Sequence, residues 1–483
     1  MRLHPSSRWT RKTTVVTVAL AMAASSCAVA ASASDELGTR AAASGSAPAA
    51  HAPDIVLILT DDQRFDTLWA MPTVQVELVA KGVEFTKGYI SNPVCCPSRS
   101  SILTGLYSHS TGVYTNHPSQ PYGGFPAFHD GSTVSTWLHD DGYRTALIGK
   151  YLNGYTGSYV PPGWDRWFVT WDGHGYYDYS ANTNGKVTGF GSASKDYSTA
   201  VLAHRATDFI MSTKQTQPLF LYFAPHAPHA PATPALRDEH AFSDLGPGRP
   251  PNYNEADVSD KPAYIRAEHT LSGSAAASVD RFRRDQYRTL LATDRAVASI
   301  LDALTVTGRL SNTLIVFMSD NGMLWGEHRW QNKLVPYEES VRVPFVVRYD
   351  ALIPAPRINR HLVVNIDLAP TFAQLAGVNT PAVEGRSLLP LLTSSKGSWR
   401  TDFLMEHLRM DPGGVPTYCG VHSERYVYVD YVTGEEELYD LVSDPFELQN
   451  EARSAEYVDV LLAMRNRLKQ LCRPRPPGFR FTF

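Results

Sequence analysis

The sequence lacks an excess of positive charge, a long apolar run beyond its N-terminal region and any visible internal repeat. Lys and Arg number 44 against 48 Asp and Glu, which gives a formal net charge of −4 at pH 7. General nucleic-acid binding needs a concentrated basic surface, so this balance argues against nucleic acid as a partner. It leaves room for a local basic groove that holds an acidic polysaccharide. Without a later apolar run, no transmembrane segment is expected.

The first 33 residues have the features of a secretory signal. Basic residues at the start precede an apolar stretch over residues 15–24, and small residues with A-x-A cleavage patterns follow. We therefore predict a signal peptide over 1–33, a secreted protein, and a disordered Ala- and Ser-rich linker over 34–52. Cys27 raises lipid anchoring as an alternative, but the residues before it make a poor lipobox.

Apolar runs alternate with helical patterns from residue 53 onward, which favours an α/β fold with a mostly parallel sheet. Four runs end just before polar or charged side chains: 54–60 before Asp61 and Asp62, 144–149 before Lys150, 219–223 before a loop with His226 and His229, and 313–319 before Asp320 and Asn321. In open α/β sheets, ligands bind at the carboxyl ends of the strands. These side chains therefore mark a candidate active site at one edge of the sheet.

A change in the pattern of apolar residues late in the chain predicts a second, smaller structural unit. Residues 285–304 still have apolar positions at the spacing of a long surface helix. Further on, residues 425–431 alternate like an antiparallel strand, and residues 457–471 have helical spacing. We predict a catalytic α/β domain over 53–395 and a C-terminal α+β subdomain over 396–483.

Residues 95–105, Cys-Cys-Pro-Ser-Arg-Ser-Ser-Ile-Leu-Thr-Gly, form the most informative stretch. Pro97 suits the first turn of a helix, which would place Cys95 just ahead of the helix N-terminus and turn Arg99 back toward it. The free N–H groups and partial positive charge of that end attract anions. A nucleophile beside an arginine can meet a tetrahedral oxyanion there, such as sulfate or phosphate. Adjacent cysteines are also common as buried structural residues.

The same stretch resembles the modification signature of the type I sulfatases, Cys-x-Pro-Ser-Arg followed by an apolar pair and Thr-Gly. In that family the cysteine is oxidised to formylglycine, so the resemblance implies this fate for Cys95 and a formylglycine-generating enzyme as a maturation partner. It also implies an alkaline-phosphatase-like fold, with a mostly parallel central sheet flanked by helices. The motifs are closest to the N-acetylglucosamine-6-sulfatase and extracellular sulfatase branch: Val-Cys-Cys-Pro-Ser-Arg-Ser-Ser, Gly-Lys-Tyr-Leu-Asn and Ala-Pro-His-x-Pro.

Asp61, Asp62, Asp320 and Asn321 offer only oxygen ligands. Such a set suits a hard cation, Ca²⁺ or Mg²⁺, rather than zinc. Type I sulfatases bind calcium through an Asp-Asp pair after the first strand and a later Asp-Asn pair. The resemblance carries those roles to these residues, with the modified Cys95 adding one oxygen. Taken singly, an Asp-Asp pair is more often a loop turn or a helix cap.

Basic residues of other segments resemble the sulfate-binding groups of the family. By resemblance, Lys150 and Lys333 contact sulfate oxygens, and Arg99 steadies the modified side chain. His229 matches the His-x-Pro pattern of the family, although the repeat of Ala-Pro-His leaves His226 as an alternative register. Either His229 or Lys333 would protonate the leaving oxygen as the general acid.

Two further residues are assigned to substrate binding. Many sulfatases carry a histidine two residues past the lysine that corresponds to Lys150. This chain has Leu152 there and then Asn153, as in the glucosamine-6-sulfatase branch. His328 lies in the late lysine segment and is expected to line the pocket, with a structural histidine as the alternative.

The resemblance predicts hydrolysis of sulfate monoesters. A hydrated aldehyde has two hydroxyls on one carbon, so one can attack sulfur and the other can lose its proton to expel sulfate. The expected metal would lower the pKa of the attacking hydroxyl. The branch implies a sulfated sugar, such as N-acetylglucosamine 6-sulfate in glycosaminoglycans. The alternatives are a phosphate or phosphonate ester hydrolase of the same superfamily and a non-catalytic protein that binds sulfated glycans.

The chain has five cysteines. With Cys27 removed and Cys95 modified, Cys96, Cys419 and Cys472 remain. An exported protein can form disulfides, so we predict a Cys419–Cys472 bond in the C-terminal region. The alternative is that both stay unpaired.

Overall fold

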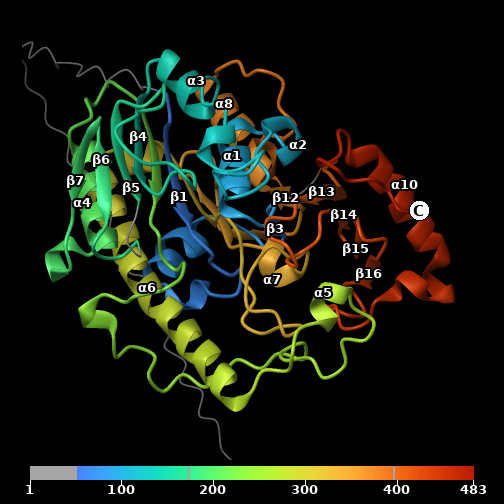
Figure 1. The fold of residues 1–483 in the computed structure, drawn as a ribbon. Coiled ribbons are helices and arrows are strands. Elements are labelled where there is room, and N and C mark those ends of the chain that lie inside the picture. The colour runs from blue at the N-terminus through green and yellow to red at the C-terminus, as the bar shows by residue number, and fades with distance from the viewer. Residues whose placement is uncertain (1–51, 172–174, 395–396) are drawn as a thin grey trace, which may run out of the picture. The chain divides into compact units, whose positions relative to one another are not determined.

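A large mixed sheet forms the centre of the computed structural model (Figure 1). The described residues are 52–171, 175–394 and 397–483, so the predicted signal peptide, Cys27 and nearly all of the predicted linker lie outside them. All of the described residues belong to one compact unit, Pro48–Phe483. Within these ranges, no helix combines the length and the apolar character needed to span a bilayer.

The large sheet contains ten strands among the described residues, in the order β11-β2-β10-β9-β1-β8-β4-β5-β6-β7. Its central strands β9, β1, β8, β4 and β5 are parallel, whereas β10, β6 and β7 run antiparallel to their neighbours. The bounds are β1 Asp54–Thr60, β2 Val83–Phe85, β4 Arg144–Gly149, β5 Arg166–Trp171, β6 Ser180–Thr183, β7 Lys186–Gly189, β8 Leu219–Ala224, β9 Thr313–Ser319, β10 Phe345–Arg348 and β11 Arg357–Asn359. A small parallel pair joins β3 (Gly88–Tyr89) to β12 (Val363–Val364).

Helices cover both faces of the large sheet, which explains why its central strands are apolar on both faces. All seven residues of β1 are buried. Ile55, Leu57 and Leu59 pack into one core with residues of α1, α3 and α8, and Val56 and Ile58 pack into another with residues of α4 and α6. The helices are α1 Cys95–Thr104, α2 Ser108–Thr111, α3 Val134–Asp140, α4 Ser198–Met211, α5 Ala263–Arg266, α6 Gly273–Val306, α7 Glu338–Val341, α8 Leu368–Ala376, α9 Leu389–Thr393 and α10 Val458–Leu471.

The predicted strands and the predicted α/β class are confirmed. Residues 54–60, 144–149 and 313–319 are strands as expected, and the fourth, β8, extends one residue further to Ala224. The predicted helix over 285–304 is part of the longer α6. Its first turns consist of small residues, and burial begins only at Val279, so they give no apolar periodicity. The helix starts at a Ser272 cap, whose side chain accepts a hydrogen bond from the Ala275 N–H.

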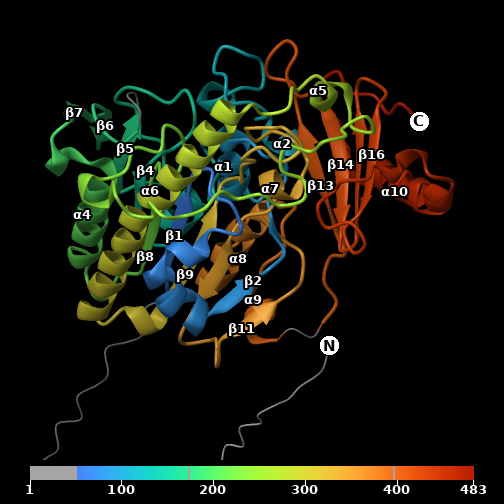
Figure 2. The ribbon, with the colours of Figure 1, turned by 90° about the horizontal axis from the view of Figure 1, so that it is seen from below.

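A smaller antiparallel sheet follows the large one, with strand order β13-β14-β15-β16 (Figure 2). Its strands are β13 Asp402–His407, β14 Tyr418–Ser423, β15 Tyr426–Tyr431 and β16 Glu436–Asp440. One face packs on the catalytic body and the other packs on α10, through cores that include Val429 and Leu468 respectively. A disulfide joins Cys419 on β14 to Cys472 after α10, as predicted. The small C-terminal α+β subdomain is therefore confirmed, and its boundary at residue 395 stays a prediction.

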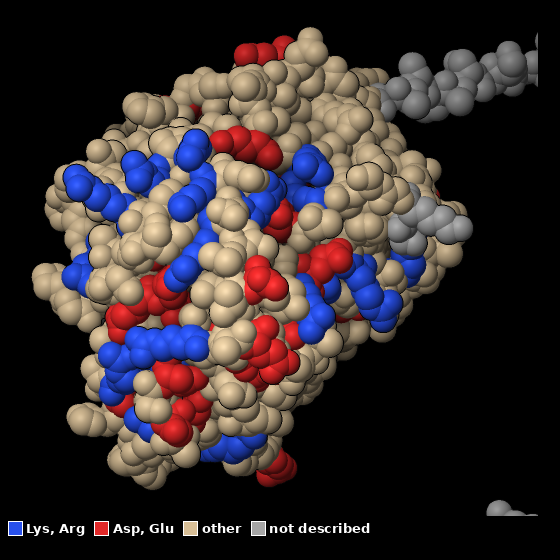
Figure 3. All heavy atoms as spheres, turned by 90° about the vertical axis from the view of Figure 1, so that its right-hand side faces the viewer, with Lys and Arg blue, Asp and Glu red and all other residues tan. Residues whose placement is uncertain are grey.

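The outer face of this subdomain has mixed charge. Figure 3 shows Lys and Arg side chains lying among Asp and Glu side chains over it. Several of them pair, such as Arg467 with Asp402 at 2.7 Å and Arg425 with Asp440 at 2.6 Å. Arg425 is therefore committed to an ion pair on its own sheet.

Candidate active site

The carboxyl ends of the parallel strands β1, β4, β8 and β9 lie at one rim of the sheet, and α1 begins beside them (strands and helix labelled in Figure 2). Cys95 is the first residue of α1. The helix ends at Gly105, which has the left-handed φ of 73° that favours glycine. Gly149 ends β4 in a similarly restricted position, because a Cβ there would lie 1.9 Å from the Ala224 oxygen. This close approach of β4 to β8 brings Lys150 to the rim.

Cys95 lies at the centre of the site and is fully buried. Its Sγ lies 2.8 Å from Lys333 Nζ and 3.4 Å from Asp61 Oδ1. Burial outweighs the two nearby lysines and raises the pKa of the thiol to about 12. A protonated thiol is a weak nucleophile, so the unmodified side chain is poorly suited to attack a sulfate ester at neutral pH.

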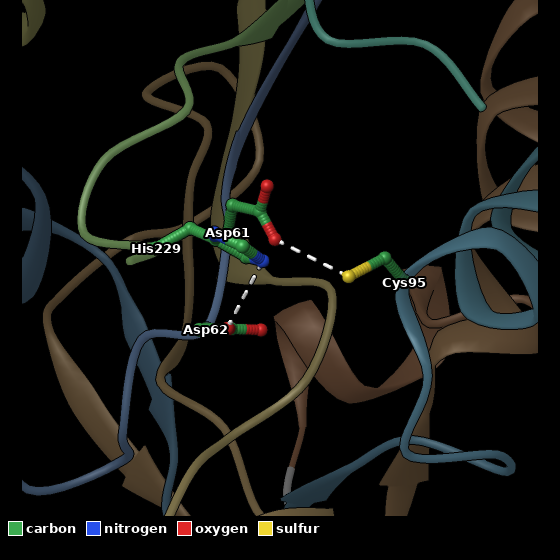
Figure 4. Close-up of side chains that lie close together, drawn as sticks. All are labelled: Asp61, Asp62, Cys95 and His229. Atoms are coloured by element: carbon green, nitrogen blue, oxygen red, sulfur yellow. Dashed lines mark hydrogen bonds and ion pairs between the residues drawn. The ribbon is translucent and has the colours of Figure 1, made fainter. Parts of the chain in front are cut away.

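Asp61 and Asp62 lie next to Cys95 and His229 (Figure 4), and hydrogen bonds join Asp62 to Asp320 and Asn321. Asp320 Oδ1 accepts a hydrogen bond from the Asp62 N–H at 3.2 Å, and Asn321 Nδ2 lies 2.5 Å from Asp62 Oδ1. Asp62 has a left-handed φ of 64°. For a residue other than glycine, that conformation persists only where the surroundings enforce it. The turn after β1 therefore presents Asp61 and Asp62 to the same small volume.

Three cationic side chains surround these carboxylates. Lys150 Nζ lies 2.5 Å from Asp61 Oδ2, and Lys333 bonds Asp62. Arg99 Nε donates to Asp320 Oδ2 at 2.7 Å, and Arg99 is almost wholly buried. The structure thus brings together all of the charged groups that the sequence assigned to the metal and to sulfate.

Both histidines of the Ala-Pro-His repeat reach the site. His229 Nε2 lies 3.6 Å from Asp62 Oδ2, and His226 Nδ1 lies 3.6 Å from Asp61 Oδ2. The two rings stand 4.7 Å apart. Burial and the neighbouring His229 lower the pKa of His226 to about 3, which keeps its imidazole neutral. His229 Nδ1 lies 2.7 Å from the Ala230 oxygen, so this nitrogen carries the proton and Nε2 faces the carboxylates.

The donor set fits a hard divalent cation. Ligand atoms of Asp61, Asp62, Cys95 and His229 lie within 4.8 Å of one another. Asn321 Oδ1 is buried without a hydrogen-bond partner among the described residues, which is the state of an oxygen prepared for a cation. Burial raises the pKa of Asp61, yet the attraction of Lys150, His229 and Arg99 outweighs it and holds that pKa well below its usual range. The carboxylate is therefore ionised and able to bind metal.

A cavity of about 230 Å³ adjoins these residues. Lys150, His226 and His229 form one side of it, and Asn153 lines it as predicted for a substrate contact. Tyr155 and Trp171 add aromatic surface, which no motif in the sequence had indicated. A larger cavity of about 660 Å³ lies between α4 and α6 and contains none of the residues that the sequence assigned to the site.

The assignment of His328 to the substrate pocket is corrected by the structure. His328 is fully buried, stacks on Tyr337 at 4.2 Å and lies 2.6 Å from a Glu255 oxygen through Nδ1. His328 is not among the residues that line the cavity, and Lys333 is the residue of this segment that reaches Cys95.

A comparison with protein-family models matches residues 53–378 to the family described as Sulfatase. The chain belongs to the sulfatase family. A second model, described as the C-terminal part of N-sulphoglucosamine sulphohydrolase, matches residues 326–474. The resemblance drawn from the motifs is thus confirmed, and with it the alkaline-phosphatase-like fold.

Relatives found by sequence comparison are also described as sulfatases. The sulfatase chain is 37% identical over 369 residues to an extracellular sulfatase SULF-1 homolog of Drosophila melanogaster, a match that covers 73% of this chain and 33% of the relative. The chain therefore spans about a third of the length of that protein. It is 30% identical over 495 residues to an N-acetylglucosamine-6-sulfatase of Capra hircus, covering 91% and 88% of the two chains. A solved structure described as a complex with its substrate D-glucosamine-2-N,6-O-disulfate matches with a TM-score of 0.79 and 25% identity, over 87% and 97% of the chains.

Proposed function

We propose that this chain hydrolyses sulfate monoesters of sulfated amino sugars, with residue 95 as the nucleophile after its oxidation to formylglycine. One observation carries the proposal. The Cys95 side chain is held at the start of α1 between an ammonium group and a set of carboxylates, yet its pKa of about 12 leaves it a poor nucleophile as a thiol. An aldehyde at the same position would, once hydrated, supply the two hydroxyls that sulfate-ester cleavage needs.

Asp61, Asp62, Asp320 and Asn321 would hold Ca²⁺, with Mg²⁺ as the alternative, together with one oxygen of the modified residue 95. When bound, the ion lowers the pKa of the attacking hydroxyl and neutralises charge on the sulfuryl oxygens. The oxygen-only set from β1 and β9 supports a hard cation.

Side chains around residue 95 would bind the sulfate group and position the modified residue. Lys150, Lys333 and His229 point cationic or N–H groups toward the space beside residue 95 and would bind sulfuryl oxygens. Arg99 is fixed by Asp320 and by the Lys150 carbonyl, which accepts from Nη1 at 2.9 Å, and it would hold the modified side chain in place. Such preorganised charge stabilises a transition state without reorganisation during the reaction.

The geometry favours His229 over Lys333 as the general acid. Burial disfavours the ammonium, but Asp62 and Cys95 outweigh this effect and raise the pKa of Lys333 well above its usual range. A group that holds its proton so tightly transfers it poorly at neutral pH. His229 lines the cavity, and in its imidazolium form Nδ1 would keep the proton held by the Ala230 oxygen while Nε2 carries the proton to be transferred.

The substrate class is supported by the cavity and by the relatives. Tyr155 and Trp171 offer aromatic surface on which a sugar ring can stack, and Asn153 offers an amide for a hydroxyl or acetamido group. Relatives are described as N-acetylglucosamine-6-sulfatases. We therefore propose a 6-sulfated N-acetylglucosamine unit, alone or in a glycosaminoglycan, as the substrate of an exported enzyme that depends on a formylglycine-generating enzyme.

The proposal is tested by turnover of N-acetylglucosamine 6-sulfate, nitrophenyl sulfate, nitrophenyl phosphate and phenylphosphonate by protein co-expressed with a maturation enzyme. We expect sulfate esters to be hydrolysed fastest. Cys95→Ala should abolish turnover, and Cys96→Ala is the matched control because Cys96 is an equally buried neighbour that fills the variable position of the motif. A dominant phosphonate rate would identify the rival hydrolase, and full activity of Cys95→Ala would refute the nucleophile.

A further inference from the structure

A second cluster of metal-ligating side chains comes from α7 and from two loops, and it shares no residue with the cluster around Cys95. Ligand atoms of His328, Glu339 and Glu447 lie within 4.8 Å of one another, and all three residues are buried. They come from different segments: the loop before α7, α7 itself, and the loop that follows β16. An ion held by all three side chains would link the catalytic domain to the C-terminal subdomain.

Oxygen atoms in this cluster have no partner among the described residues. Glu339 Oε2 and Glu447 Oε1 are buried and accept no hydrogen bond. The fully buried Asn252 presents its Nδ2 to this cluster, 3.0 Å from Glu339 Oε1 and 3.3 Å from His328 Nε2, while its Oδ1 has no partner among the described residues. An unsatisfied buried acceptor destabilises the fold, and more so when it is charged. Unsatisfied carboxylate oxygens from two buried residues in one place favour a bound cation.

The histidine is oriented as a metal ligand. His328 Nδ1 lies 2.6 Å from Glu255 Oε2, so it carries the proton and Nε2 presents a lone pair to the cluster. A carboxylate that accepts the second ring N–H is the usual partner of a metal-bound histidine, because it fixes the tautomer and the ring. His328 and Glu447 also have left-handed φ values of 49° and 53°, so their surroundings enforce both conformations.

The cationic groups nearby are committed to other partners. Lys261 Nζ donates to the Leu448 oxygen at 2.6 Å and lies 3.6 Å from Glu255. Arg64 pairs with Glu327 at 2.7 Å and with Asp66.

Glu338, next to Glu339, is paired with His422 at 2.7 Å and with Arg342 at 3.3 Å. Burial and the neighbouring Glu338 raise the pKa of Glu447 well above its usual range, and burial and Glu327 raise that of Glu339.

We propose that His328, Glu339 and Glu447, with the amide oxygen of Asn252 turned inward, bind a second divalent metal ion. One imidazole nitrogen with carboxylate oxygens suits Zn²⁺ better than Ca²⁺, which prefers oxygen ligands throughout. Since these ligands are buried and away from the substrate cavity, the ion is structural. The inference does not depend on the proposed function, because it requires no chemistry at residue 95.

Metal analysis of the purified chain tests the site. After dialysis against EDTA, wild-type protein should take up Zn²⁺ and gain thermal stability, and Glu447→Gln and His328→Gln should each lose this uptake. Asp62→Asn should keep it, because that change affects only the active-site cluster. The Zn²⁺ uptake of Cys96→Ala serves as a second reference.

The alternative to a metal is a proton shared between Glu339 and Glu447. Unchanged melting temperature of the dialysed wild type with added Zn²⁺, and no uptake by mass spectrometry, would overturn the proposal. So would equal Zn²⁺ uptake by Glu447→Gln and the wild type. Zn²⁺ held by the cluster around Cys95 is identified by its loss in Asp62→Asn. Uptake that remains in Asp62→Asn and is absent from His328→Gln belongs to the second site, and circular dichroism shows whether each variant is folded.

Discussion

Replacing Lys333 by Met removes the cation that touches both Cys95 and Asp62. Lys333 Nζ lies 2.8 Å from Cys95 Sγ and bonds Asp62, and the side chain is almost wholly buried. Asp62 is buried too, and the attraction of Lys333 and His229 lowers its pKa against the effect of burial. Methionine has a similar length, so the change removes charge with little loss of packing.

Activity and metal binding should respond in opposite directions. Loss of one preorganised charge from a transition state costs about 10²–10³ in kcat, or about 2.7–4 kcal/mol. Two unit charges 4 Å apart interact by about 4 kcal/mol at an effective dielectric constant of 20. Removing the ammonium beside Asp62 should therefore strengthen Ca²⁺ binding by tenfold or more, about 1.4 kcal/mol. Without the ion, folding stability should fall by up to about 3–5 kcal/mol.

The assay is turnover of nitrophenyl sulfate, normalised to the aldehyde content of residue 95, beside a Ca²⁺ titration followed by calorimetry. Lys333→Arg keeps the charge and should recover part of the activity. Lys87→Met is the matched control, because Lys87 is only partly buried and its Nζ donates to the Glu424 oxygen at 3.2 Å, outside the residues of the site. A kcat within threefold of the wild type, or weaker Ca²⁺ binding by Lys333→Met, would refute this role for the lysine.

Three further predictions concern the metal and the stability of the fold. EGTA should abolish hydrolysis and added Ca²⁺ should restore it more fully than Mg²⁺; activity that survives EGTA counts against the ion. Arg400 donates to Asp367 through two nitrogens, one at 2.6 Å, so Arg400→Met should lower the free energy of unfolding by about 3 kcal/mol with kcat unchanged, and a melting curve like that of the wild type would contradict this. Burial disfavours a charged His109, but Glu384 and Glu406 outweigh it and raise its pKa to about 10, so its contribution is complete below about pH 6.5 and disappears as pH rises through 10. The difference in melting temperature between wild type and His109→Gln should therefore shrink from pH 6 to pH 10, and a constant difference would exclude the ion pair.

The parallel core was predictable because burial on both faces leaves an uninterrupted apolar run. All residues of β1 and β9 are buried, and the sequence of each contains no charged residue between its ends. The edge strands were harder to predict. β7 is exposed throughout and β11 has only three residues, so neither carries an apolar pattern. Their pairing is set by neighbouring strands and not by their own composition.

The site was predictable where chemistry is tied to a strand end. Asp61, Asp320 and Lys150 each follow a strand of the central sheet, so the topology alone brings them together. The position of His328 could not be predicted, since both His328 and Arg329 have left-handed φ values, which no residue pattern in this segment indicates. No sequence pattern indicated the aromatic lining of the cavity either, because Tyr155 and Trp171 come from separate segments.

The relation between the chemical state of residue 95 and turnover tests the central claim most directly. Preparations with different degrees of conversion can be made by varying the level of the maturation enzyme, and the aldehyde fraction of the peptide that contains residue 95 can be measured by mass spectrometry. We predict that kcat for a sulfate ester rises in proportion to that fraction along a line through the origin. Full turnover by protein whose residue 95 is still a thiol would contradict the account.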